Sequence, residues 1–130
     1  METIKSYTDL EQSKKLAEIL PLESADGFYE AQHNPITNEW EDILFTGTKW
    51  ASKDVVIPAW SLAALLELIP KIYYPVKDHP TYLILGKPKD KWCALYWDAT
   101  GMQDGEQTLE DNPIDACYEM IIKLHELNLL

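Results

Sequence analysis

The sequence predicts an α+β fold with about three helices and a small antiparallel sheet, in the order α-β-β-α-β-β-α. Three helix-like segments with capping residues or prolines at their ends support this, as do two pairs of short apolar segments separated by turn residues. Of the 130 residues, 46% are hydrophobic and 25% are charged, which suits one core of ordinary composition. No internal repeat or linker divides the chain, so residues 1–130 are expected to form a single globular domain.

The first expected helix runs from about Asp9 to Leu20. Thr8 and Glu11 have the spacing of a capping box, in which the threonine oxygen accepts the Glu11 amide and the carboxylate reaches back. Apolar residues recur at roughly helical spacing after this point, and Pro21 ends the run.

A first hairpin is expected from residues 28–33 and 43–46, which have the composition of short strands. The residues between them include an Asn-Pro and a Thr-Asn pair, which favour turns. Residues 47–54 are expected to form a loop.

The clearest helix lies between Pro58 and Pro70, with Ser61 or Ala59 close to its N-cap. Glu67 is the one charged residue in this segment, and a helix that is apolar nearly all round is typical of a buried element. The sequence therefore predicts the central core helix here. Its apolar stripe consists of Leu62, Leu65, Leu66 and Ile69.

A second hairpin is expected from residues 81–86 and 92–97, joined by a lysine-rich turn. The second of these strands is bulky on both faces, so we expect it inside the sheet. Residues 98–110 are polar and contain two glycines, which predicts a loop. The last helix is expected to begin with Asn112 as its N-cap and Pro113 at its first position.

The chain is strongly acidic, with 22 Asp and Glu against 11 basic residues and a formal net charge of −11. Every basic residue is lysine, whereas arginine is the side chain that binds phosphates and guanine edges with two donors. Because nucleic-acid binding normally needs a basic patch, we expect no direct binding to DNA or RNA, and no attraction to an anionic membrane. Residues 16–48 and 92–122 each contain seven acids and no lysine. They are either solvated faces or a docking surface for a basic partner.

The compartment is predicted from the cysteines and the apolar runs. The N-terminal residues have no apolar stretch of signal-peptide length, and the longest apolar runs fall far short of the ~20 residues that a spanning helix needs. Cys93 and Cys117 lie in apolar stretches, and a secreted scaffold of this size usually carries more cysteines. We therefore expect reduced, buried thiols and a cytoplasmic protein.

No catalytic, cofactor-binding or metal-binding site is expected. Both cysteines lack a local protease signature and have apolar neighbours, so a thiol nucleophile is not indicated. Zinc-binding spacings are absent, and His33, His79 and His125 are scattered. The chain has no phosphate-binding glycine motif, and residues 98–106 do not supply oxygen ligands at the positions that calcium requires.

The tryptophans point to a candidate interaction surface. Trp60, Trp92 and Trp97 fall inside expected helices or strands and are expected in the core. Trp40 and Trp50 lie beside expected loops, and aromatic side chains are enriched at binding hot spots. The candidate partner-binding surface combines these two with acidic residues of the second half of the chain: Trp40, Trp50, Asp104, Glu106, Glu110 and Asp111.

Three segments carry a resemblance to known sequences. They are Ile-Pro-Ala-Trp-Ser-Leu-Ala-Ala-Leu-Leu-Glu-Leu-Ile-Pro at 57–70, Pro-Ile-Asp-Ala-Cys-Tyr-Glu-Met-Ile-Ile-Lys-Leu at 113–124 and Ala-Asp-Gly-Phe-Tyr at 25–29. They resemble a group of small uncharacterised acidic proteins from prophages and mobile elements of gut Bacteroidetes. The shared positions are mostly apolar, so the resemblance implies a fold and a bacterial, mobile-element origin, and it implies no activity or site residue.

Three functions remain open at this stage. The leading hypothesis is a cytoplasmic accessory protein without catalytic activity that binds another protein; the partner is unknown, and a basic protein is one candidate. The first alternative is an acidic mimic of nucleic acid that inhibits a DNA-binding enzyme, which requires rows of carboxylates at phosphate-like spacing. The second is a small-ligand or sugar-binding module, which requires a concave pocket containing Trp40 or Trp50. The oligomeric state is left open.

Overall fold

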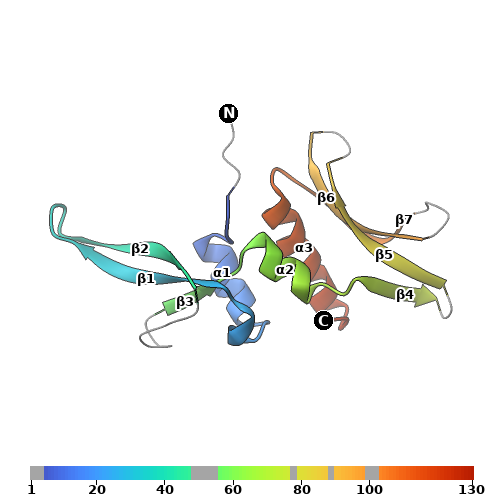
Figure 1. The fold of residues 1–130 in the computed structure, drawn as a ribbon, viewed down its shortest axis with the longest axis horizontal. Helices are drawn as coiled ribbons and strands as arrows, with labels where there is room; N and C mark the ends of the chain where they lie inside the picture. Colours follow the sequence, from blue (N-terminus) through green and yellow to red (C-terminus); the bar gives the residue numbers. More distant parts are fainter. Residues whose placement is uncertain (1–4, 48–55, 77–78, 88–89, 99–102) are drawn as a thin grey trace. The chain divides into compact units, whose positions relative to one another are not determined.

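The computed structural model describes residues 5–47, 56–76, 79–87, 90–98 and 103–130 (Figure 1). It divides into an N-terminal unit, Ser6–Ala64, and a C-terminal unit, Leu65–Leu130 with Lys5. The single domain expected from the sequence stays a prediction. The predicted α+β class is confirmed, and the predicted order matches the structure in outline. The described residues contain two antiparallel sheets where one was expected, and additional strands belong to both.

The N-terminal unit contains a short helix and a three-stranded antiparallel sheet in the order β2-β1-β3. The predicted hairpin is confirmed, although its second strand begins earlier than expected. The strand before Trp60 was not predicted, because its proline resembles the first residue of a helix. As an edge strand, β3 tolerates a residue without an N–H group. The elements are α1 (Leu10–Ala17), the 3₁₀ helix η1 (Leu22–Ser24), β1 (Gly27–Asn34), β2 (Glu39–Thr46) and β3 (Val56–Ala59).

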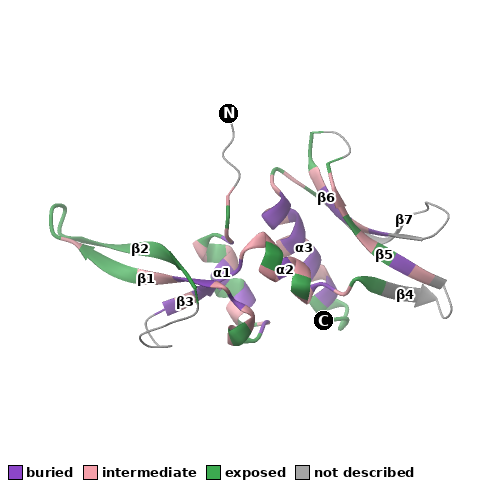
Figure 2. Ribbon diagram, in the orientation of Figure 1, coloured by how far each residue is buried: buried purple, intermediate pink, exposed green. Residues whose placement is uncertain are grey.

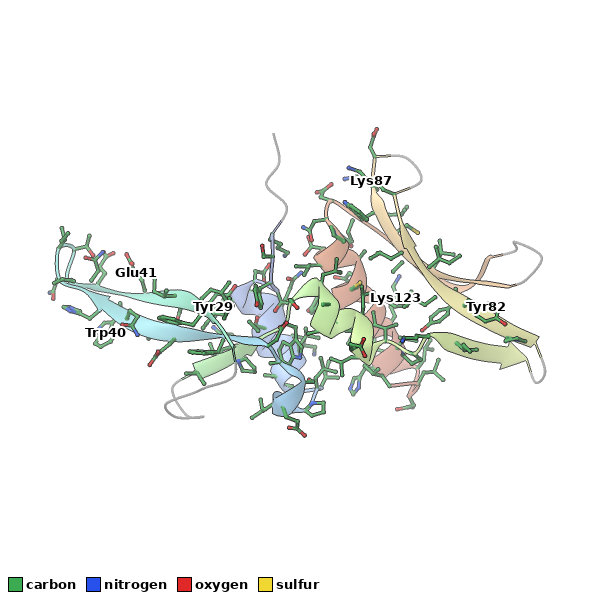
Figure 3. All side chains as sticks on the ribbon, viewed as in Figure 1. Tyr29, Trp40, Glu41, Tyr82, Lys87 and Lys123 are labelled. Atoms are coloured by element: carbon green, nitrogen blue, oxygen red, sulfur yellow. The ribbon has the colours of Figure 1, made fainter. Side chains whose placement is uncertain are left out.

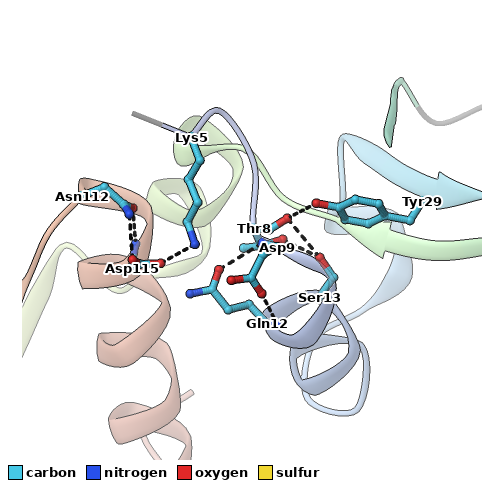
Figure 4. Close-up of polar contacts among 8 residues, drawn as sticks. All are labelled: Lys5, Thr8, Asp9, Gln12, Ser13, Tyr29, Asn112 and Asp115. Atoms are coloured by element: carbon cyan, nitrogen blue, oxygen red, sulfur yellow. Dashed lines mark hydrogen bonds and ion pairs between the residues drawn. The ribbon is translucent and has the colours of Figure 1, made fainter. Parts of the chain in front are cut away.

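The capping box of α1 lies one residue later than predicted. Asp9 is the N-cap, and its Oδ1 accepts the Gln12 amide over 2.8 Å while Gln12 Oε1 accepts the Asp9 amide over 3.1 Å. Thr8 is fully buried and makes other hydrogen bonds (Figure 4). Since its hydroxyl has partners elsewhere, Asp9 takes the capping position that the sequence assigned to Thr8.

Thr8 anchors the start of α1 to the rest of its unit. Its Oγ1 lies 2.7 Å from Ser13 Oγ and accepts the Trp60 amide over 3.2 Å, while its own amide donates to the Trp60 carbonyl over 2.9 Å. The Tyr29 hydroxyl donates to the Thr8 carbonyl over 2.8 Å (Figure 4). These bonds join residues far apart in sequence and satisfy polar groups that are costly to bury unpaired.

The middle helix, α2 (Leu62–Leu68), is shorter than the segment between its two prolines. Ser61 lies next to its start, and Ser61 Oγ accepts the Ala64 amide over 3.2 Å, which confirms one of the two predicted caps. Leu65 and Ile69 are buried, but Leu66 is half-buried and Ala63 is exposed. The expectation of a helix buried on most of its surface is therefore wrong, because Leu65 is the one buried residue of α2.

In the C-terminal unit, four antiparallel strands pair in chain order, β4-β5-β6-β7. The second predicted hairpin is confirmed, and its bulky strand β6 lies inside the sheet as expected. The loop predicted over residues 98–110 is wrong, because its second part forms β7 and pairs with β6. Pairing with an inner strand outweighs the low strand propensity of its glycine and acids. The strands are β4 (Ile72–Val76), β5 (His79–Gly86), β6 (Trp92–Asp98) and β7 (Gln103–Glu110).

The last helix, α3 (Pro113–Glu126), begins as the sequence predicted, with Asn112 Oδ1 accepting the Asp115 amide over 2.9 Å and Pro113 at the first position. Lys5 Nζ lies 2.5 Å from Asp115 Oδ1, so the first turn also carries an ion pair (Figure 4). α3 packs on β6 and β7, and its buried face forms much of the core of the unit. The buried residues of this helix are Pro113, Ile114, Ala116, Cys117, Met120, Ile121 and Leu124.

The two cysteines are free and buried, as predicted, with 1% of Cys93 and 0% of Cys117 exposed. Burial raises the pKa of the Cys117 thiol to about 12, so the reactive thiolate is scarce at neutral pH. We expect both thiols to resist a water-soluble thiol reagent in the native protein and to react at once after denaturation. Thiol titration before and after addition of denaturant measures this, and rapid labelling of both native cysteines would contradict it.

Candidate functional site

The β1–β2 hairpin of the N-terminal unit presents an open edge. β2 is the terminal strand of its sheet, and all eight of its residues are exposed (Figure 2). β1 pairs with β2 along its whole length, from Gly27 opposite Thr46 to Asn34 opposite Glu39. β3 pairs only with the first half of β1, up to Glu30. Among the described strands, the outer half of the hairpin is therefore a two-stranded ribbon.

The register shows which backbone groups face that edge. The Gly47 amide donates to the Asp26 carbonyl over 2.8 Å, and these two residues continue the β1–β2 pairing as a hydrogen-bonded pair. Hydrogen-bonded pairs alternate with non-bonded pairs in an antiparallel ladder. The N–H and C=O groups of every second residue of β2 therefore point away from β1, toward a side where no described strand lies. These residues are Trp40, Asp42, Leu44 and Thr46.

Large apolar side chains lie along this edge strand. The exposed fraction is 72% for Trp40 and 37% for each of Ile43, Leu44 and Phe45. Phe45 stacks on Phe28 of β1 with ring centroids 5.4 Å apart. An edge strand that exposes apolar side chains together with free backbone groups is a template for pairing with another chain.

The tip of the hairpin holds Trp40 in a defined position. Asn34 Oδ1 accepts the Ile36 amide over 2.9 Å, and Asn38 adopts a left-handed conformation with φ 58°, which asparagine tolerates better than most residues. His33 Nε2 lies 3.0 Å from Asn38 Oδ1, and the His33 ring is 5.3 Å from the Trp40 ring. The turn and the cross-strand contact therefore order the aromatic side chain near the end of the ribbon.

Carboxylates lie on the same strand as these apolar groups. Glu39, Glu41 and Asp42 are exposed on β2, and Glu30 of β1 is half-buried. Trp40 and Glu41 project from opposite sides of the hairpin, because successive residues of a strand face opposite ways (Figure 3). No lysine occurs between Lys15 and Lys49 in the sequence. The edge therefore combines apolar anchors with negatively charged side chains.

The candidate residues predicted from the sequence are distributed over both units. Trp40 lies on the open edge of the hairpin, and Trp50 is outside the described residues. Asp104 and Glu106 belong to β7, where the structure describes the backbone but not these side chains. The grouping of all six residues into one surface stays a prediction.

Glu110 and Asp111 lie at the end of β7, close to the start of α3. Asp111 is exposed and forms an ion pair with Lys91. Burial raises the pKa of the Glu110 carboxyl, and the negative charges of Glu119, Asp115 and Asp111 raise it further. Asp111 thus has a basic partner within its own unit.

Sequence reasoning missed the apolar residues that follow Trp40. Ile43, Leu44 and Phe45 have the composition of a buried strand, and their exposure follows from the position of β2 at a sheet edge. One signal was present: Glu39, Glu41 and Asp42 precede the apolar run and place charge on both faces of the strand.

Within the part of the chain that the structure describes, no three His, Cys, Asp or Glu side chains are grouped closely enough to hold a metal ion. No helix among the described residues has the length and hydropathy needed to cross a membrane. Comparisons of the chain with protein-family models, with curated proteins and with solved structures found no match. The resemblance to prophage and mobile-element proteins stays a prediction.

Proposed function

We propose that this is a cytoplasmic protein without catalytic activity that binds another protein through the open edge of the β1–β2 hairpin. The observation that carries the proposal is the edge strand itself, in which all eight residues are exposed. The partner would supply an extended segment that pairs with β2 as an added strand. Backbone hydrogen bonds then supply affinity, and the side chains of Trp40 and Leu44 supply apolar contacts.

The chemistry of the edge favours a basic partner segment. A strand laid beside β2 would place its side chains next to Glu39, Glu41 and Asp42 as well as the apolar residues. Lysine or arginine at alternating positions would compensate these charges, because opposite charges on adjacent strands attract. A second copy of β2 is disfavoured, since it would bring carboxylates toward carboxylates. The proposed partner is therefore a protein with an exposed segment in which basic and apolar residues alternate.

A synthetic ten-residue peptide of alternating lysine and valine tests this binding mode. We expect it to bind the full-length protein and to quench or shift the fluorescence of exposed Trp40, with affinity that falls as salt is added. The matched peptide of alternating glutamate and valine is expected not to bind. Equal binding of both peptides would contradict the charge complementarity, and binding of neither would overturn the proposal.

Two substitutions at one position separate strand addition from simple charge attraction. Asp42→Pro removes an N–H that points to the open edge without removing a bond to β1, and we expect binding to weaken about tenfold or more, equivalent to about 1.4 kcal/mol. Asp42→Ala removes the same carboxylate but keeps the N–H, and we expect a loss of less than about fivefold. Titration of the peptide against both variants measures this, and equal losses would argue against an added strand.

A further inference from the structure

The two faces of the β1–β2 hairpin carry different side chains. Successive residues of a strand point to opposite faces, so the residues of β2 divide into two sets. Two contacts between the strands lie on one of these faces: the Phe45 ring stacks on Phe28, and the Asn34 side-chain amide donates to Glu41 Oε1 over 3.4 Å. We call this face the graded face. Its residues on β2 are Glu39, Glu41, Ile43 and Phe45.

On the graded face, the charge changes from one end of β2 to the other. Glu39 and Glu41 lie in the half of the strand next to the hairpin turn, and both are exposed. Ile43 and Phe45 lie in the half next to the base of the hairpin, and each is 37% exposed. Glu30 of β1 is half-buried on the same face, opposite Ile43. The graded face is therefore acidic toward the turn and apolar toward the base.

The opposite face of β2 has no such gradient. It carries the Trp40 ring, whose centroid lies 5.3 Å from that of His33 on β1. Asp42 is the one acid of β2 on this face, and its neighbours there along the strand are Trp40 and Leu44. Charge on this face is therefore confined to the middle of the strand. The residues of β2 on this face are Trp40, Asp42, Leu44 and Thr46.

The direction of a partner strand follows from the gradient. Both strand pairs of the N-terminal sheet are antiparallel, and antiparallel pairing is slightly more stable per residue than parallel pairing. Because β2 runs from the turn toward the base, an antiparallel partner on its open edge runs from the base toward the turn. The first half of the partner then lies beside Ile43 and Phe45, and its second half lies beside Glu39 and Glu41. Apolar side chains suit the first position and basic side chains the second.

We infer that the partner segment lies antiparallel to β2 and has, on the graded face, apolar residues in its N-terminal half and lysine or arginine in its C-terminal half. This polarity rests on the proposed function, which specifies only that basic and apolar residues alternate. The reverse order would place basic side chains against Ile43 and Phe45 and leave Glu39 and Glu41 beside apolar residues. Both mismatches are unfavourable, because a charged group loses water without gaining a partner.

Two peptides of one composition test this polarity, both acetylated and amidated to remove the terminal charges. In an antiparallel pair with β2, Thr-Val-Thr-Val-Thr-Lys-Thr-Lys places its lysines beside Glu41 and Glu39. The second peptide, Thr-Lys-Thr-Lys-Thr-Val-Thr-Val, places them beside Phe45 and Ile43. We expect the first peptide to bind the full-length protein about fivefold more tightly, because it gains two exposed ion pairs. Titrations followed by the amide signals of β2 in NMR spectra measure both affinities.

A spin label reports the direction of the bound strand. A nitroxide at the N-terminus of the first peptide should broaden the amide signal of Thr46 more than that of Glu39, because broadening falls steeply with distance. Two substitutions locate the lysines. Glu41→Gln should weaken binding of the first peptide about two- to fivefold. Asp42→Asn, a matched loss of one carboxylate on the opposite face, should weaken it less.

The outcomes separate the polarity from the proposed function. Equal binding of the two peptides, tighter binding of the second or stronger broadening at Glu39 would overturn the polarity alone. Equal losses for Glu41→Gln and Asp42→Asn would also overturn it, because the lysines would then not lie on the graded face. If neither peptide binds, the polarity is wrong. If the peptide of alternating lysine and valine also fails to bind, the proposed function is wrong with it.

Discussion

Replacing Leu65 by alanine is expected to lower the free energy of unfolding by about 2–5 kcal/mol, which is a large part of the 5–15 kcal/mol typical of a small protein. Leu65 is completely buried, so the substitution removes packing contacts and leaves a cavity. Its position in α2 adds no penalty of its own, because alanine is the best helix former. Denaturant melts followed by circular dichroism measure the effect.

Leu66→Ala is the matched control for this prediction. The two leucines are neighbours in the same helix, but Leu66 is half-buried, so less surface is lost and the remaining space is open to water. We expect Leu66→Ala to lower the free energy of unfolding clearly less than Leu65→Ala does. Equal decreases would mean that both sides of α2 are buried, as the sequence alone had predicted.

The largest loss in the N-terminal unit is expected for Trp60→Ala, at about 3–5 kcal/mol. Trp60 is fully buried, and its Nε1 donates to Ser24 Oγ over 3.0 Å. The substitution therefore empties a large volume and leaves Ser24 without this donor. Trp60→Phe should lower the free energy of unfolding by less than Trp60→Ala, since the phenylalanine ring still fills part of the space.

Trp40→Ala serves as the control, because this residue has the same chemistry but is 72% exposed. A surface substitution of this kind usually changes stability by no more than about 0.5 kcal/mol. Melts followed by circular dichroism avoid the loss of fluorescence that both substitutions cause. If Trp40→Ala lowered the free energy of unfolding as much as Trp60→Ala, the hairpin tip would be packed rather than exposed.

Local sequence signals predicted some elements well. Asn112 and Pro113 define the start of α3 by themselves, because the cap and the fixed backbone angle of proline act within one turn. The hairpin of β5 and β6 was equally visible, since two apolar segments flank a short polar turn. In both cases the information lies within a few residues.

Other elements depend on residues distant in sequence. Thr8 and Asp9 are both good caps, and the choice between them rests on the bonds of Thr8 to Trp60, which is 52 positions away. Likewise Pro58 fits a helix start as well as an edge strand. Its pairing with Phe28 places it in the edge strand β3. Such choices need the tertiary structure.

The candidate site was predictable only in part. Trp40 was identified from the sequence because it lies beside turn residues. The importance of Asp42 and Leu44 was not, because it follows from the order of strands in the sheet and from the alternation of hydrogen bonds along the edge. Neither property can be read from the composition of a single strand.

The boundary between the two units falls inside α2, between Ala64 and Leu65. Most proteins built from separable modules carry their boundaries in exposed linkers, where recombination can exchange one part without damage to the other. A crossover here would split a helix whose cap, Ser61, lies in one unit and whose buried residues, Leu65 and Ile69, lie in the other. The two units are therefore expected to be inherited together, as one gene segment rather than as interchangeable parts.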